Sequence, residues 1–220
     1  MKLGIIGLPQ SGRSTIFSAL TGARGDEEAI ASHRDQMRGM VKVLDQRINY
    51  LSAVYKPKKT IYAVVEYLLP SDSATGSESI TWNQARACDA FIHVVRNFPG
   101  AGGIAPKSEE DYRNLEDEMI INDLSVAEKR VERIELDLKR GKKEDENEYS
   151  LIKKSRELLE SGRPLREKPE LSNAPELKGF TFLSAKPEII IVNNDDDNEL
   201  LPEWESMTDN IERLAVRGRL

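Results

Sequence analysis

The sequence predicts an α/β fold in which helices cover both faces of a doubly wound, mostly parallel sheet, with an antiparallel helical hairpin (a coiled coil) inserted into it. Three observations favour this class. A glycine-rich turn follows a short apolar segment near the N-terminus, further short apolar runs recur along the chain, and a long charged region with regularly spaced apolar residues separates two of them. The first two indicate alternating strands and helices, and the third indicates the hairpin.

Short, continuous apolar runs predict strands that are buried on both faces, as in a parallel sheet. Three such runs occupy residues 3–6, 90–95 and 189–192. A fourth segment, residues 61–69, is rich in valine, isoleucine and tyrosine, and residues 214–216 are the candidate for a last strand. Because stretches of helical character separate these runs, a sheet covered by helices on both faces is expected.

Residues 7–15 read Gly-Leu-Pro-Gln-Ser-Gly-Arg-Ser-Thr and have the pattern of a P-loop, with Arg13 where lysine is usual. A strand that feeds a glycine-rich turn and then a helix aims several backbone N–H groups, and the positive end of the helix dipole, at one point. The pattern therefore predicts a P-loop NTPase fold with a site for nucleotide phosphates. The predicted phosphate-binding residues are Gly7, Pro9, Gln10, Ser11, Gly12, Arg13, Ser14 and Thr15.

Two side chains of this loop are expected to have distinct roles. The Ser14 hydroxyl is predicted to bind Mg²⁺, and the basic side chain of Arg13 to reach the outer phosphates. A guanidinium is a planar fork, unlike the compact ammonium of lysine, so the exchange is not neutral. The motif thus favours phosphate binding over fast phosphoryl transfer. The alternative is that residues 7–15 form an ordinary turn between a strand and a capped helix.

Between residues 109 and 167 the charge density rises, and apolar residues recur at alternating intervals of four and three, as in a heptad seam. The seam residues are Ile120, Leu124, Ala127, Val131, Ile134 and Leu138. Gly141 breaks the pattern, and a second amphipathic segment then runs to Gly162 and Pro164. Its apolar face is expected to consist of Leu151, Ile152, Leu158 and Leu159. Two antiparallel helices are therefore predicted, the alternative being two ordinary surface helices of the main domain.

The composition describes a folded protein with an acidic balance of charge. The 220 residues carry a net charge of −6, with 32% charged and 39% hydrophobic residues, which excludes a disordered chain. This balance argues against a surface broadly committed to nucleic acid, so no DNA partner is expected. No apolar run approaches the length of a membrane span, and the single cysteine, Cys88, excludes an internal disulfide framework. A cytoplasmic monomer without a membrane partner is the expectation.

Several blocks along the chain together resemble the YchF/Obg-like ATPase family of translation-factor-class GTPases. They resemble the opening of the family with its P-loop, the segment before its second strand, its third-strand signature and its base-recognition region. These blocks are residues 2–21, 45–47, 56–57, 87–98 and 184–193. The predicted hairpin lies where the family inserts a coiled coil, and the resemblance covers essentially the whole chain.

The resemblance implies a purine nucleotide, GTP or ATP, as the ligand, Mg²⁺ as its cofactor, and contact with the ribosome or RNA. It also implies that Asn193 and Asp196, in the segment Asn193-Asn194-Asp195-Asp196, read the base. An amide can donate to and accept from a base edge, and a carboxylate can accept from its N–H groups. The class usually carries N-K-x-D here and the family N-x-x-E, so the segment departs from both. The choice between ATP and GTP stays open, and a solvated acidic turn is the alternative.

The catalytic positions implied by the resemblance are altered. Counted forward from residues 56–57, the aspartate of the Mg²⁺ shell falls at Leu69 and the glycine that binds the γ-phosphate falls at Asp72. The slot of the catalytic residue falls at Ser73, and the switch threonine aligns near His33. Losing one preorganised group typically lowers a rate by ~10²–10³. Hydrolysis is therefore expected to be slow, and no catalytic residue is assigned.

Two functions follow from these observations. The leading one is purine-nucleotide binding by a divergent relative of this family, with slow hydrolysis and a ribosome-linked regulatory role. The alternative is a non-catalytic pseudo-GTPase that docks a protein or the ribosome through its hairpin. Two basic clusters are candidates for RNA contact, with solvated turns as the alternative. They are Lys56, Lys58 and Lys59, and Lys139, Arg140, Lys142 and Lys143 at the predicted hairpin tip.

The expected organisation is a G domain in two parts, residues 1–108 and 168–220, with the hairpin at residues 109–167 inserted between them. The family continues into a C-terminal TGS domain that is not in this sequence, so the chain is expected to be a fragment. Neither histidine has partners at metal-ligand spacing, and His93, inside a predicted strand, is expected to be a satisfied core residue.

Overall fold

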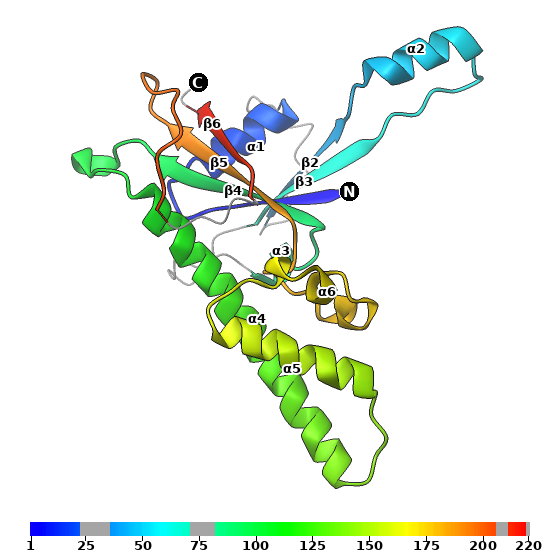
Figure 1. The fold of residues 1–220 in the computed structure, drawn as a ribbon. Helices are drawn as coiled ribbons and strands as arrows, with labels where there is room; N and C mark the ends of the chain where they lie inside the picture. The colour runs from blue at the N-terminus through cyan, green and yellow to red at the C-terminus, as the bar shows by residue number, and fades with distance from the viewer. Residues whose placement is uncertain (23–35, 71–81, 206–210, 219–220) are drawn as a thin grey trace.

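The computed structural model describes residues 1–22, 36–70, 82–205 and 211–218. They form a six-stranded sheet in the order β2-β3-β1-β4-β5-β6, with helices on both faces (Figure 1). β2 pairs antiparallel with β3, and the other pairings are parallel. The strands are β1 Lys2–Ile6, β2 Gln36–Lys42, β3 Val64–Pro70, β4 Ala90–Asn97, β5 Glu188–Asn194 and β6 Arg213–Arg217. The predicted mostly parallel α/β class is confirmed.

The helices are α1 Arg13–Thr21, α2 Gln46–Tyr55, α3 Trp82–Ala85, α4 Ser108–Lys139, α5 Glu146–Glu160 and α6 Pro169–Ser172. Short 3₁₀ turns occupy Ala101–Gly103, Leu165–Glu167 and Pro175–Phe180. Within the part of the chain that the structure describes, none of the helices combines the length and the apolar character that a membrane crossing needs.

Alternation along the strands gives the sheet two apolar faces. On β1, Ile5 packs in one cluster with Phe17 of α1, whereas its neighbour Ile6 packs in another with Leu115 and Met119 of α4. Successive side chains of a strand point to opposite faces, so α1 and α4 cover opposite sides. Burial on both faces explains why the central strands are continuous apolar runs.

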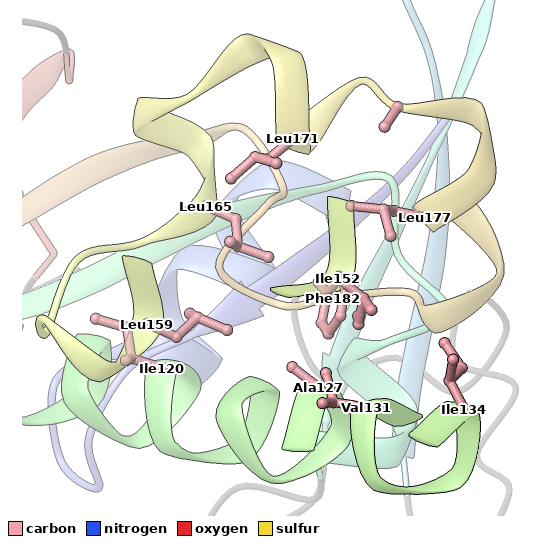
Figure 2. Packing of buried hydrophobic residues seen from close by; sticks show 11 residues of the cluster. Ile120, Ala127, Val131, Ile134, Ile152, Leu159, Leu165, Leu171, Leu177 and Phe182 are labelled. Carbon is pink, nitrogen blue, oxygen red and sulfur yellow. The ribbon is translucent and has the colours of Figure 1, made fainter. Parts of the chain in front are cut away.

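The two halves of α4 pack against different partners. Its first half lies on the sheet, and its second half extends beyond it and pairs with α5 (Figure 1). Figure 2 shows the buried cluster around this pairing. It includes Ile120, Ala127, Val131 and Ile134 of α4 and Ile152 and Leu159 of α5. The predicted seam therefore packs, with Leu124, Leu151 and Leu158 partly buried against it, except that Leu138 at its end is 45% exposed.

The chain turns between α4 and α5 at the predicted break. Gly141 has a φ of 75°, a left-handed conformation that glycine adopts without strain. Asp145 caps α5 by accepting from the backbone N–H groups of Asn147 at 2.8 Å and Glu148 at 3.2 Å. Arg130 of α4 donates to the Glu148 carboxylate at 2.6 Å, which joins the two helices near the turn.

A buried carboxylate fixes the base of this helix pair to the sheet. Asp123 of α4 accepts from the backbone N–H groups of Leu183 at 3.0 Å and Ser184 at 2.7 Å, and from the Ser184 hydroxyl at 2.8 Å. Arg86 donates to the same carboxylate at 3.1 Å. The segment that leads into β5 is therefore tied to the middle of α4.

Several elements and one boundary differ from the expectations. β2, α2 and the short helices α3 and α6 were not predicted from the sequence, and the strand expected at residues 61–69 begins only at Val64. β2 lies at the edge of the sheet and mixes polar with apolar residues, so it lacks the apolar run of a central strand. α2 buries no side chain and therefore has no apolar stripe directed at a core.

Candidate phosphate-binding site

The turn after β1 depends on two glycines. Gly7 has a φ of 153° and Gly12 a φ of 96°. A Cβ on Gly7 would collide with the Val94 carbonyl oxygen and lie 2.8 Å from Ser11 Oγ. A Cβ on Gly12 would collide with the amide nitrogen of Asn193. A side chain at either position would therefore displace the loop or the strands beside it.

α1 begins directly behind this loop, and no side chain caps its positive end. Its N-cap is Gly12, which supplies no side-chain hydrogen bond, and its first turn contains no acidic residue. The first N–H groups of a helix have no acceptor within the helix itself. Backbone donors and the helix dipole therefore meet at the loop, an arrangement that binds phosphate groups.

The side chains of the loop differ in exposure. Ser14 is exposed, whereas Arg13 is only 7% exposed. A Cβ on Gly7 would lie 3.3 Å from Arg13 Cδ, so the stem of Arg13 folds back against the loop. Ser11 is buried, and its hydroxyl has no hydrogen-bond partner among the residues described. A cavity of about 10 Å³ beside Ser11 and His93 has the size of one water molecule, too small for a phosphate.

The remaining predicted residues of the loop lie in the turn and at the helix start. Pro9 and Gln10 form the turn, with Gln10 in the left-handed region at a φ of 63°. The Ser11 N–H donates to the Leu8 carbonyl at 3.2 Å and closes this turn. Thr15 is half-buried in the first turn of α1. Their contact with a nucleotide stays a prediction.

Asn193 joins the loop to the carboxyl edge of the sheet. It lies in β5, between Arg96 of β4 and Val216 of β6. Its Nδ2 donates to the Ser11 carbonyl at 3.0 Å, and its Oδ1 accepts from the Gly218 N–H at 2.8 Å. Because the side chain is buried, these bonds hold the loop against β5 and the segment after β6. A role in reading the base stays a prediction.

Asp196 and the block before β5 lie in different surroundings from Asn193. Asp196 is exposed in the turn after β5, where its backbone oxygen accepts from Arg217 at 3.4 Å. Ser184 and Lys186 precede β5 and so lie at the amino edge of the sheet, opposite the loop. Lys186 Nζ donates there to the Cys88 carbonyl at 2.5 Å. Residues 184–193 resemble a base-recognition region, and within them Asn193 contacts the loop.

Of the two residues expected near Mg²⁺ that the structure describes, one could bind the ion and the other could not. Leu69, aligned by resemblance with a metal-shell aspartate, is buried in β3 and packs in the cluster with Ile5 and Phe17, so it offers the ion no oxygen. Ser14 offers an exposed hydroxyl in the first turn of α1. Mg²⁺ would be held by Ser14 together with phosphate and water oxygens, which suits an ion that keeps several waters. Outside the described residues lie His33, Asp72 and Ser73.

A buried charged network that the sequence analysis missed links the sheet to α4. Arg166 Nη1 lies 2.6 Å from Glu116 Oε1 and 3.1 Å from Glu188 Oε1. Tyr112 donates to Glu188 at 2.9 Å. His93 Nδ1 lies 3.8 Å from Glu188 Oε2, and among the described residues neither atom has a hydrogen-bond partner. His93 is thus buried as expected, but its imidazole is not satisfied by a hydrogen bond at Nδ1.

Burial and charge shift the two carboxylates of this network in opposite directions. Burial alone would raise the pKa of Glu188, but Arg166, with smaller contributions from His93 and Tyr112, lowers the pKa to about 2. For Glu116, burial raises the pKa and outweighs the opposing effect of Arg166. Arg166 and Glu116 are 50 residues apart, so no local sequence pattern indicates their contact.

A cleft of about 830 Å³ opens at the amino edge of the sheet, on the side away from the loop. The amino ends of β4 and β5 line it together with the segment that follows α5. Its charged lining residues include Asp89, Arg163, Lys178, Lys186 and Glu188. Because the glycine loop follows the carboxyl end of β1, this cleft is not part of the predicted phosphate site.

The sheet, the glycine-dependent turn after β1 and the uncapped start of α1 define a P-loop NTPase fold. No family model matches the chain. It is 31% identical to the ribosome-binding ATPase YchF of Pasteurella multocida, over 89% of this chain and 57% of that protein. It is 28% identical to the Obg-like ATPase 1 of Caenorhabditis elegans, over 98% of this chain and 60% of that protein.

A solved structure has the same fold. The YchF GTPase of Schizosaccharomyces pombe superposes with a TM-score of 0.67 at 24% identity, over 89% of this chain and 57% of that one. The chain is also 29% identical to the ribosome-binding ATPase YchF of Bacillus subtilis, over 98% of this chain and 62% of that protein. The resemblance to the YchF/Obg-like ATPase family is therefore confirmed, and the chain spans about 57–62% of the length of these curated relatives.

Proposed function

We propose that this chain binds a purine nucleoside triphosphate, ATP or GTP, through the loop at residues 7–15, hydrolyses it slowly and serves a ribosome-linked regulatory role. The observation that carries the proposal is the uncapped, acid-free start of α1 directly behind Gly12. The names of the relatives, ribosome-binding ATPase, Obg-like ATPase and YchF GTPase, support the nucleotide and the link to the ribosome.

In this proposal, backbone N–H groups of the loop bind the phosphates, and Ser14 binds the Mg²⁺ that accompanies them. Bound Mg²⁺ would neutralise phosphate charge. Asn193 and Asp196 contact the base, and Asn193 also keeps the loop in place through Ser11. The division into a G domain and an inserted hairpin, the monomeric state and the cytoplasmic location remain predictions.

One observation favours the second candidate, a pseudo-GTPase that binds a partner without catalysis. Leu69 is buried in the core at the position where the family pattern implies a metal-shell aspartate. Phosphoryl transfer depends on positioning and on charge neutralisation by the metal, so an apolar residue there lowers the rate more than it lowers phosphate affinity. Nucleotide binding without turnover would identify this candidate.

Calorimetric titration with ATP, GTP and their non-hydrolysable analogues, with Mg²⁺ and with a chelator, tests the proposal. We expect micromolar binding that weakens without Mg²⁺. Ser14→Ala should lose most of the Mg²⁺ dependence, whereas Ser18→Ala, in the next turn of α1, should behave as the wild type. The absence of heat with every nucleotide would contradict the proposal and leave the non-catalytic scaffold.

Phosphate release measured on the same protein separates the two candidates. Slow turnover that Arg13→Ala abolishes would support the enzyme, because the guanidinium is the basic group of the loop. Micromolar binding with no turnover in the wild type would support the pseudo-GTPase.

A further inference from the structure

The antiparallel β2–β3 ribbon carries α2 away from the body of the molecule (Figure 1). α2 buries none of its side chains. A helix shorter than ~12–15 residues is marginal in water unless something stabilises it. Here the adjoining residues do so, because Asp45 caps its start and the Lys56 N–H bonds to the Ser52 carbonyl at its end. We call residues 43–63 the α2 arm.

The polar side of α2 faces the segment that returns from the helix to β3. Ser52 Oγ lies 2.6 Å from Thr60 Oγ1, and Tyr62 donates to Asn49 Oδ1 at 2.5 Å. Residues three and four apart share a helix face, so Asn49 and Ser52 lie on one side of α2. This side is occupied by the chain that returns to β3.

The apolar side of α2 is left to solvent. It consists of Tyr50, Leu51, Val54 and Tyr55, with exposed fractions of 70%, 50%, 54% and 77%. Leu44 and Ile61, elsewhere in the arm, are exposed as well. A surface helix normally buries its apolar stripe against a core, and a contiguous exposed apolar patch marks an interaction site. The orientation of α2 is therefore the reverse of the usual one.

The α2 arm is also basic, in a chain whose net charge is −6. Asp45 is its single acidic residue, and Arg47 already pairs with it at 2.6 Å. Lys56, Lys58 and Lys59 follow the helix, and within the described part of the chain no carboxylate pairs with them. The patch therefore combines an apolar centre with uncompensated positive charge at one end.

We propose that the apolar face of α2 docks into an apolar groove with an acidic rim on a protein component of the ribosome. This inference rests on the ribosome-linked part of the proposed function. An amphipathic helix laid in a groove is a common mode of protein recognition, and tyrosine is enriched among the residues that dominate such interfaces. The three lysines complement carboxylates at the rim and favour encounter with them. Leu51 and Val54 offer RNA neither stacking nor hydrogen bonds, so a protein groove fits this face better.

Co-sedimentation with purified ribosomes tests the surface. The double variant Leu51→Ser with Val54→Ser changes two exposed side chains, so the fold should persist, and calorimetry with nucleotide checks that it does. We expect at least a tenfold weaker affinity for ribosomes. Leu136→Ser with Leu138→Ser changes two exposed leucines near the hairpin tip and is the matched control, expected to bind as the wild type.

Cross-linking identifies the class of partner. Tyr50→p-benzoylphenylalanine places a photoreactive group on the exposed face of α2. We expect an adduct with ribosomes whose size ribonuclease does not change, and in which mass spectrometry identifies a peptide of a ribosomal protein. An adduct that ribonuclease destroys would overturn the proposal in favour of RNA.

The remaining outcomes separate this inference from the function on which it rests. If wild type and both double variants bind ribosomes equally, or if only the hairpin variant weakens, the α2 proposal is overturned and the ribosome-linked function stands. If the wild type binds nucleotide but no ribosomes, the ribosome-linked function fails, and the α2 proposal fails with it.

Discussion

At the residue scale, Arg166 supplies the positive charge that stabilises two buried carboxylates. Its guanidinium contacts both Glu116 and Glu188. Arg166→Met should lower the free energy of unfolding by about 3–5 kcal/mol, because it leaves buried charge without a partner. Urea unfolding measures the loss. Arg163→Met, which removes an exposed pair with Glu167, should cost less than about 1 kcal/mol. Equal losses in both variants would contradict this assignment.

The same network predicts an acid-sensitive contribution to stability. The pKa of Glu188 is about 2 in the folded protein against an ordinary value of 4.5, so its contribution is present above pH 4.5 and lost as the pH falls toward 2. The pKa of Glu116 is raised in the folded protein, so its contribution to stability is present at low pH and is lost as the pH rises through that pKa. Glu188→Gln should therefore flatten the decline of unfolding free energy between pH 5 and pH 2.5. An unchanged slope would refute the shift.

At the element scale, Asn193 connects three parts of the site: the glycine loop, β5 and the segment after β6. Asn193→Ala should cost about 1–3 kcal/mol of stability, because two backbone groups lose their partner. Nucleotide affinity should fall as the loop loses its support. Calorimetry measures the affinity, with the exposed Asn198→Ala as the control. If the two variants bind nucleotide alike, Asn193 does not support the loop.

The pairing of α4 with α5 depends on its shared apolar cluster (Figure 2). Ile134 is fully buried there. Ile134→Ala should cost about 2–5 kcal/mol through the cavity it creates. Leu138→Ala, at the exposed end of the seam, should cost about 0.5 kcal/mol or less. Thermal unfolding of the two variants provides the comparison, and similar midpoints would mean that the helices do not pack as described.

At the scale of the whole molecule, the loop and the helix pair belong to opposite edges of one sheet. The loop follows the carboxyl end of β1, whereas Asp123 ties α4 to the segment that enters the amino end of β5. β4 runs between the two edges and carries His93, which lies beside the small cavity under the loop and near Glu188 of the network. A partner bound at the helix pair would therefore be coupled to the nucleotide across the sheet near His93.

Much of this architecture could be predicted because it rests on local patterns. Apolar runs gave the central strands, the glycine spacing gave the loop, and the heptad spacing gave the paired helices. β2 and α2 were not predicted because neither buries an apolar stripe in the core. The contacts of Asn193 with Ser11, and of Arg166 with Glu116, join residues far apart in the sequence. Such pairs become visible only when the fold brings the strands and helices together.

The central claim is that backbone amides of the loop bind the phosphates of a nucleotide, and amide hydrogen exchange tests it most directly. Exchange of residues 7–15 is compared in free protein and in protein saturated with the Mg²⁺ complexes of non-hydrolysable ATP or GTP analogues. Slower exchange is expected at Gly12, Arg13 and Ser14, with no change at Arg163 in the cleft. Unchanged exchange in the loop at saturating nucleotide, or protection confined to the cleft, would contradict it.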